Sequence, residues 1–220
     1  MALSAAALLL AACPRADDGA KPVARKVGTP KVVTIEEIGP QKSAPGTQVP
    51  PALQPSGMGP YFWLTARGTQ NYKCAFADAG SAAWSAAVPE AVLYYPGTEK
   101  VFGRHFAGPT WEKDDDQSAF AGSKAATDGF VALPSPEDAG FDIPWLLVPK
   151  KSASDGGVFA PALFIQRLDT EGGLVTNQPQ ACDAKAADAG LSVKVPYRAK
   201  YVLLRAIGAE TKPSAAPPGY

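Results

Sequence analysis

Residues 103–112 read GRHFAGPTWE, and this stretch decides the fold that the sequence predicts. Gly108-Pro109 breaks the chain between two runs of extended character, so we expect the segment to turn back on itself as a β-hairpin. Glycine accepts the positive φ that a type II′ turn needs at its first central position, and proline fixes the negative φ of the second. In this register, and equally with a four-residue loop, His105 faces Glu112.

The same stretch contains the one histidine of the chain. A carboxylate opposite His105 would favour its protonated form, which makes His105 and Glu112 the candidate acid–base pair. The alternative is a structural pair that braces the hairpin, because no nucleophile or metal ligand accompanies them. In a further alternative no hairpin forms here. The chain then continues through Trp111 and turns at Asp114–Asp116 to pair with Ser118–Gly122.

The composition indicates a loop-rich β protein. The chain has 220 residues, including 22 prolines and 21 glycines, which suits short strands joined by turns. Its 21 basic and 21 acidic residues balance, so no nucleic-acid partner is predicted. No cofactor is expected, because G-x-G-x-x-G does not occur. No metal is expected either: one histidine excludes a histidine-rich site, and Asp114–Asp116 lacks EF-hand spacing, with Ala119 where glycine is required.

A single β domain is predicted for residues 51–208, between a proline-rich, disordered tether (13–50) and a disordered tail (209–220). Runs of strand-forming residues between glycine and proline turns predict an all-β fold, an antiparallel β-sandwich or barrel of about eight to ten short strands. One or two short helices are expected at most, and the candidate is Asp183–Ala189 with Asp183 as its cap. The candidate strands are Tyr61–Thr65, Gln70–Phe76, Trp84–Val88, Ala91–Tyr95, Lys100–Phe106, Ala119–Ala125, Ile143–Val148, Val158–Leu168, Leu191–Tyr197 and Tyr201–Ile207.

The amino terminus resembles a bacterial lipoprotein signal peptide. Residues 1–12 are small and aliphatic, and Leu10–Cys13 reads Leu-Ala-Ala-Cys, which looks like a lipobox. The resemblance implies cleavage before Cys13 and attachment of lipid to Cys13, although no lysine or arginine precedes it. The alternative is an ordinary secretory leader with a chance cysteine. Pro14 stands where inner-membrane lipoproteins typically carry aspartate, so the outer membrane is the expected location.

Two cysteines remain once Cys13 carries a lipid. Cys74 and Cys182 form an even pair in an exported protein, and a disulfide between them is expected. The alternative is two buried free thiols.

Four further residues complete the candidate binding set with His105. Trp111 and Trp145 are large aromatic residues that either offer a face to a sugar or another ligand or fill the core. Arg104 lies beside His105, and Arg167 interrupts an apolar strand, where a buried cation needs a partner. A glycan or a small ligand is therefore the expected partner of the domain.

Six ordered sequence blocks span the predicted domain. They are ARG-x-Q-x-Y-x-C (66–74), PEA-x-L (89–93), G-x-H-x-AGPTWE (103–112), IPWLL (143–147), IQR followed by Thr170 and two glycines (165–173), and VPY-x-A-x-Y (195–201). Together they resemble a family of secreted proteins, the domain of unknown function 3455, over about residues 50–205. The segment 113–118 departs from the Asp-Gly-Ser that usually follows TWE in that family. The resemblance implies no activity, because none is established for the family.

These observations predict an exported bacterial envelope lipoprotein, anchored through Cys13, with a disulfide-linked β domain that binds a ligand, a glycan or a protein. The alternative is a hydrolase or isomerase that uses His105 and Glu112 for acid–base chemistry. A cleft around His105 would favour the enzyme, and a histidine packed flat beneath other side chains would favour the binding domain.

Overall fold

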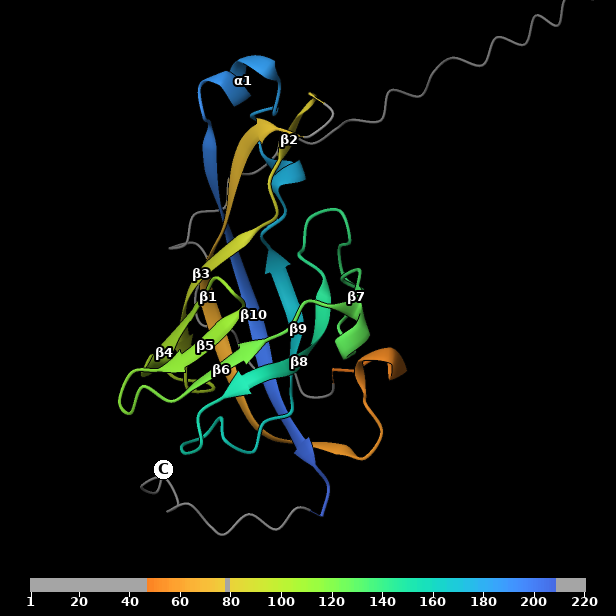
Figure 1. Ribbon diagram of the computed structural model, residues 1–220, viewed down its shortest axis with the longest axis vertical. Coiled ribbons are helices and arrows are strands. Elements are labelled where there is room, and N and C mark those ends of the chain that lie inside the picture. Colours follow the sequence, from red (N-terminus) through yellow and green to blue (C-terminus); the bar gives the residue numbers. More distant parts are fainter. Residues whose placement is uncertain (1–46, 78–79, 209–220) are drawn as a thin grey trace, which may run out of the picture.

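The computed structural model describes residues 47–77 and 80–208, which are coloured in Figure 1. The predicted signal peptide (1–12), Cys13, most of the tether (13–50) and the tail (209–220) lie outside the described residues. Within the described residues, no helix is long and apolar enough to cross a bilayer. The strands are β1 Met58–Phe76, β2 Ala82–Trp84, β3 Val88–Tyr94, β4 Val101–Phe106, β5 Thr110–Lys113, β6 Ala119–Gly122, β7 Val131–Leu133, β8 Trp145–Ala153, β9 Phe164–Gly172 and β10 Ser192–Ala206. The helical elements are η2 Pro51–Leu53, η3 Ala126–Asp128, η4 Val175–Asn177 and α1 Ala184–Asp188.

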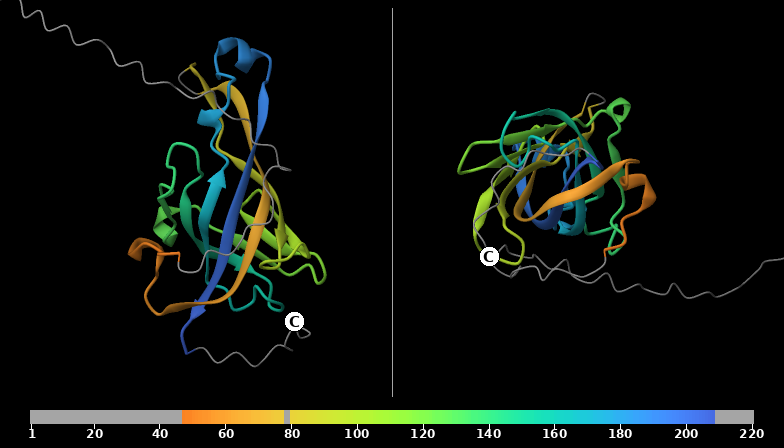
Figure 2. Two further views of the ribbon diagram at one scale, coloured as in Figure 1. Left: turned by 180° about the vertical axis from the view of Figure 1, so that it is seen from behind. Right: turned by 90° about the horizontal axis from the view of Figure 1, so that it is seen from below.

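The strands form a closed antiparallel barrel. Their order is β10-β9-β8-β6-β5-β4-β3-β1, and β1 also pairs with β10, which closes the ring. The short strands β2 and β7 lie outside the ring, on the end of β1 and on β8 respectively. Seen from below, the strands are arranged around a common centre (Figure 2). The prediction of an all-β antiparallel fold with one short helix is confirmed, and ring closure leaves these eight strands without a free edge over their paired lengths.

The two strands that close the ring are longer than predicted. The runs Tyr61–Thr65 and Gln70–Phe76 belong to one strand, β1, because Gly68 continues the ladder and pairs with Tyr197. A Cβ atom on Gly68 would lie 2.1 Å from the carbonyl oxygen of Glu90 in β3. Glycine therefore permits two backbones to pass closely at this position, and it does not make a turn. The predicted runs at 191–197 and 201–207 are likewise joined in β10.

Other elements agree with the prediction only in part. Strand β8 continues through Pro149 to Ala153, and β9 begins at Phe164, so the predicted start at Val158 is wrong. Strand β7 was not predicted. The helix is confirmed as α1, where a side-chain oxygen of Asp183 accepts a hydrogen bond from the backbone N–H of Ala186 at 2.8 Å.

The disulfide between Cys74 and Cys182 is confirmed, with an S–S distance of 2.02 Å. It lies where β1 and β10 extend beyond the barrel, next to β2 and α1 at the top of Figure 1. The Cys74 residue is 0% exposed. The bond therefore fixes the segment that precedes β10 to the far end of β1.

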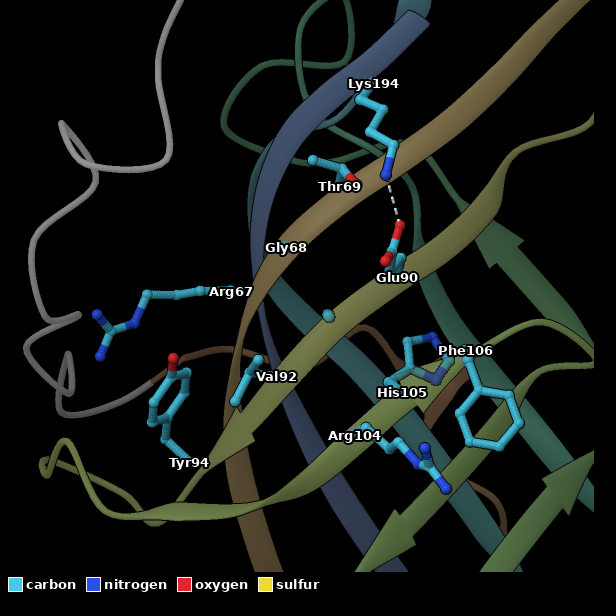
Figure 3. A pocket seen from close by; sticks show the side chains of 11 residues that line it. Arg67, Gly68, Thr69, Glu90, Val92, Tyr94, Arg104, His105, Phe106 and Lys194 are labelled. Atoms are coloured by element: carbon cyan, nitrogen blue, oxygen red, sulfur yellow. Dashed lines mark hydrogen bonds and ion pairs between the residues drawn. The ribbon is translucent and has the colours of Figure 1, made fainter. Parts of the chain in front are cut away.

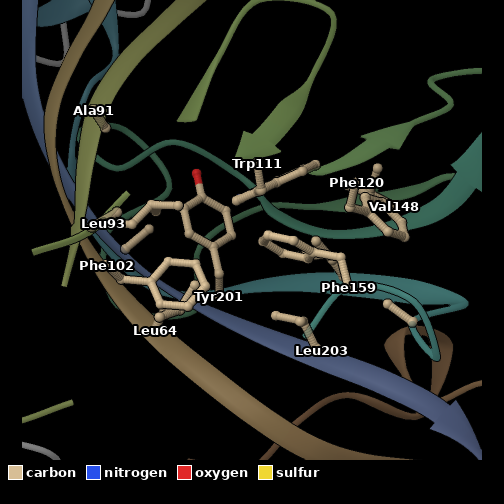
Figure 4. Packing of buried hydrophobic residues seen from close by; sticks show 14 of the residues in the cluster. Leu64, Ala91, Leu93, Phe102, Trp111, Phe120, Val148, Phe159, Tyr201 and Leu203 are labelled. Atoms are coloured by element: carbon tan, nitrogen blue, oxygen red, sulfur yellow. The ribbon is translucent and has the colours of Figure 1, made fainter. Parts of the chain in front are cut away.

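Apolar residues pack on both faces of the barrel wall. The inside is filled by a cluster in which Tyr201 lies among Trp111, Phe159 and Phe102 (Figure 4). Outside, Leu53 of η2 covers β8, β9 and β10 together with Trp145 and other residues. The amide nitrogen of Gln166 in β9 donates to the carbonyl oxygen of Leu53 at 2.7 Å, which attaches the entering chain to the outer face of the barrel.

Candidate functional site: an open groove over β1, β3 and β4

The hairpin of residues 103–112 forms, but its register differs by one residue from the prediction. His105 pairs with Trp111, and Arg104 pairs with Glu112, so the predicted pairing of His105 with Glu112 is wrong. The loop has three residues, 107–109, and Gly108 within it has φ +101°. A one-residue slip would turn Trp111 out of the core, and burial of this large side chain therefore fixes the register. The second turn, at residues 114–116, also forms and joins β5 to β6.

His105 points into the barrel and packs flat against Trp111. The two ring centroids are 4.3 Å apart at an interplanar angle of 17°, and His105 is 2% exposed. Its Nδ1 atom lies 2.8 Å from the carbonyl oxygen of Thr110, to which the neutral ring can donate. Burial lowers the pKa of His105 to about 3, the Thr110 contact opposes this in part, and the cations of Arg167 and Lys124 lower it further.

We expect the imidazole of His105 to stay neutral in the folded protein between pH 8 and the onset of acid unfolding. The unfolded chain takes up a proton near the usual pKa of 6.5, whereas the folded chain does so only at about 3. Stability is therefore fully present above pH 6.5 and is lost as pH falls toward 3, by up to about 1.4 kcal/mol per pH unit. Because the sequence has one histidine, its ring NMR signals can be followed through a pH titration without overlap from another histidine. A titration midpoint near pH 6.5 in the folded protein would contradict the expected neutral imidazole.

Glu112 lies on the opposite, outer face of the hairpin. Nε of Arg104 donates to its Oε1 atom at 2.9 Å, and the guanidinium lies 5.4 Å from the ring centroid of Phe106. Hydrogen bonding to Glu112 raises the pKa of Arg104, and the charge of Glu112 adds to this effect. His105 and Glu112 thus face different environments, with the barrel wall between them.

An open groove runs over the outer surface of β1, β3 and β4, with a volume of about 740 Å³. Figure 3 shows Val92 near its middle, Lys194 and Glu90 at one end, and Arg67 with Tyr94 at the other. Its lining consists of Arg67, Gly68, Thr69, Glu90, Ala91, Val92, Tyr94, Arg104, His105, Phe106 and Lys194. The groove therefore combines an apolar centre with charged ends.

Ion pairs form at both charged ends of the groove. Arg67 donates to both carboxylate oxygens of Glu99 at 2.6 Å, and its guanidinium lies 4.3 Å from the ring centroid of Tyr94. At the other end, Lys194 donates to Glu90 at 2.8 Å. The Lys194 hydrogen bond lowers the pKa of Glu90, and a hydrogen bond from Asn71 adds to this. The cations at both ends are thus balanced by carboxylates of the protein itself.

Of the predicted binding residues, only Arg104 presents its side chain to the groove; His105 is part of the lining, but its ring points into the barrel and the residue is 2% exposed. Trp111 and Trp145 are 1% and 3% exposed, so their ring faces are covered by the core. Arg167 lies on β9, where its Nε atom donates to the carbonyl oxygen of Pro144 at 2.9 Å. Within the described ranges, no three His, Cys, Asp or Glu side chains are grouped to hold a metal ion.

Sequence reasoning missed most of the lining. Glu90, Val92 and Tyr94 alternate with buried residues along β3, and this period of two was the available signal for an outward row. No nearby sequence signal indicated that Arg67, which precedes β3 in the chain, lies beside these three residues. The register of β1 and β3 sets Arg67 opposite Val92.

The comparisons with known proteins give the family and no activity. No curated protein and no solved structure matches the chain. A family model described as "Protein of unknown function (DUF3455)" matches residues 55–205, well over half of the chain and nearly all of the barrel. The expected resemblance is thereby confirmed: the chain belongs to the DUF3455 family of proteins of unknown function.

Proposed function

We propose that this protein is an exported lipoprotein of the bacterial envelope, held in the outer membrane by lipid on Cys13, whose barrel binds a ligand in the groove over β1, β3 and β4. The lipobox-like sequence before Cys13 supports the anchor. The disulfide supports export, because such bonds persist in oxidising compartments.

The groove is the observation that carries the binding function. Ligand sites combine an apolar surface with a few placed polar groups, and Val92 with its charged surroundings fits this description. The wall beneath is rigid, because β3 pairs with β1 on one side and β4 on the other. The backbone that carries these side chains is held in position before the ligand arrives, which reduces the entropy lost on binding.

The alternative, hydrolysis or isomerisation by His105 and Glu112, requires both groups to reach one substrate. His105 is stacked beneath Trp111, and Glu112 is bound to Arg104 on the other face of the sheet. Two groups on opposite faces of one wall do not meet the geometric requirement for shared acid–base catalysis. The geometry therefore favours binding.

Lipid attachment is tested by metabolic labelling with radioactive palmitate in a bacterial host. The wild-type chain is expected to be labelled and to fractionate with the outer membrane, whereas Cys13→Ser should carry no label. Cys74→Ser is the matched control, because it removes a cysteine that takes part in the disulfide and should stay labelled. Equal labelling of the wild type and Cys13→Ser would contradict the anchor.

The groove is tested by placing a large side chain at its centre. Val92 is 38% exposed, so Val92→Trp can fill the groove without entering the core. The full-length Cys13→Ser chain is applied to an array of oligosaccharides and peptides to find its ligands. The same chain with Val92→Trp added should no longer bind these ligands. Val101→Trp is the control, because Val101 is 49% exposed on the neighbouring strand but does not line the groove. If both variants still bind the same ligands, the binding site lies outside the groove.

A further inference from the structure

We propose that the groove binds an acidic oligosaccharide, whose carboxylates replace the glutamates that now pair with Arg67 and Lys194. This inference rests on the proposed function, because it names the ligand class of the same groove.

The lining offers cations that an anion can bind once it displaces their glutamate partners. Arg67, Arg104 and Lys194 line the groove, and Glu90 is the one acidic residue among the lining residues. The lining therefore carries two more positive than negative charges. The remaining glutamates that pair with these cations, Glu99 and Glu112, approach from outside the lining.

The carboxylates at the two ends of the groove are replaceable. The side chains of Glu99 and Glu90 are 61% and 64% exposed, and ion pairs between exposed groups contribute little to stability. Each can turn into solvent and expose its cation. A ligand that carries several carboxylates on one chain gains from each further contact without a second loss of translational freedom.

Arg67 is already arranged to hold a carboxylate. Its guanidinium is stacked on Tyr94, and its Nη2 atom binds both oxygens of Glu99. A planar, stacked guanidinium loses little conformational freedom when it binds a carboxylate. The contact with Glu99 is the contact that a carboxylate of the ligand would make.

The barrel favours a saccharide over an acidic peptide. An extended peptide commonly binds a sheet by pairing with the backbone of a free edge. Under the groove, β3 is paired with β1 and β4, and β4 is paired with β3 and β5, so these strands offer no free edge there. What remains is Val92 and the aromatic side chains of Tyr94 and Phe106, next to cations. The apolar C–H face of a uronic-acid ring and its carboxylate fit this combination.

The experiment is a calorimetric titration of the full-length Cys13→Ser chain with oligogalacturonate, with its methyl ester as the uncharged counterpart and with polyglutamate of equal charge. We expect oligogalacturonate to bind, the ester to bind roughly tenfold more weakly, about 1.4 kcal/mol, and polyglutamate to bind no better than the ester. Raising the salt concentration should weaken the binding of oligogalacturonate.

Three variants locate the charge effect. Arg67→Gln should weaken oligogalacturonate binding by roughly tenfold. Arg205→Gln is matched to it, since Arg205 also stacks on a tyrosine, 5.3 Å from the ring centroid of Tyr61, but does not line the groove. It removes the same charge and should leave the affinity unchanged. Glu99→Gln should strengthen binding, because it removes the internal competitor for Arg67; a role in stability alone would not produce a gain.

The outcomes separate this inference from the proposed function. If the ester binds as tightly as the acid and Val92→Trp abolishes both, the groove binds a ligand but acid recognition is refuted. If polyglutamate binds as tightly as oligogalacturonate and depends on Arg67, the ligand is an acidic peptide and the saccharide is refuted. If oligogalacturonate does not bind, the inference fails. If it binds and Val92→Trp has no effect, both the inference and the groove fail.

Discussion

Replacement of both Cys74 and Cys182 by alanine is expected to lower the free energy of unfolding by about 4–5 kcal/mol. The two residues are 108 positions apart, so the bond restricts a long loop of the unfolded chain. That loop contains β2 to β9, and the cysteines lie next to the strands that close the ring. Such a loss is a large share of the stability of a domain of this size.

Denaturation by guanidinium chloride, followed by tryptophan fluorescence, measures this effect. Reduction of the wild-type protein should reproduce the lower midpoint of the double variant. Cys13→Ser provides the control, because it removes a cysteine outside the disulfide. A double variant within 1 kcal/mol of the wild type, about a fifth of the expected loss, would show that the unfolded chain gains little freedom without the bond.

Trp111→Ala should cost about 3–5 kcal/mol of folding free energy. The side chain is 1% exposed and lies in contact with the rings of His105, Phe120 and Tyr201. Alanine would leave a cavity in the middle of the barrel that the paired strands cannot close. The pKa of His105 should rise toward its ordinary value in the same variant, because the ring loses the cover that excludes water.

Trp111→Phe separates packing from hydrogen bonding. The indole Nε1 atom of Trp111 is buried without a hydrogen-bond partner among the described residues, so its removal costs no bond. Phenylalanine should therefore be markedly less destabilising than alanine in the same denaturation assay. Equal losses for the two variants would mean that the indole makes a polar contact on which the fold depends.

The predictable part of the fold was local. Period-two alternation located most strands, and the cap at Asp183 located the helix, because these signals lie within a few residues of one another. Gly68 shows the limit of such signals. It looks like a turn residue in sequence, whereas its role is set by β3, which passes close to it in space.

The candidate site was less predictable for a related reason. His105 was identified as unusual because of its residue type, but its environment depends on a register that differs by one residue. The groove draws on β1, β3, β4 and Lys194 of β10, whose positions span residues 67–194. A surface assembled from separate strands has no motif of its own, so only the paired sheet reveals it.

The attachment of Leu53 to β9 has a mechanical consequence. Thr47 donates to both carboxylate oxygens of Asp169, and Gln166 binds Leu53, so the chain is fastened twice to β9 before it enters β1. In the ring, β9 stands three places from β3, the strand at the middle of the groove. A pulling force applied at the amino-terminal side of Thr47 therefore acts first on these two hydrogen-bonded contacts and then on the pairing of β1 with β10. The disulfide at the far end of β1 limits how far β1 and β10 can separate, so the groove can stay intact while the molecule is pulled.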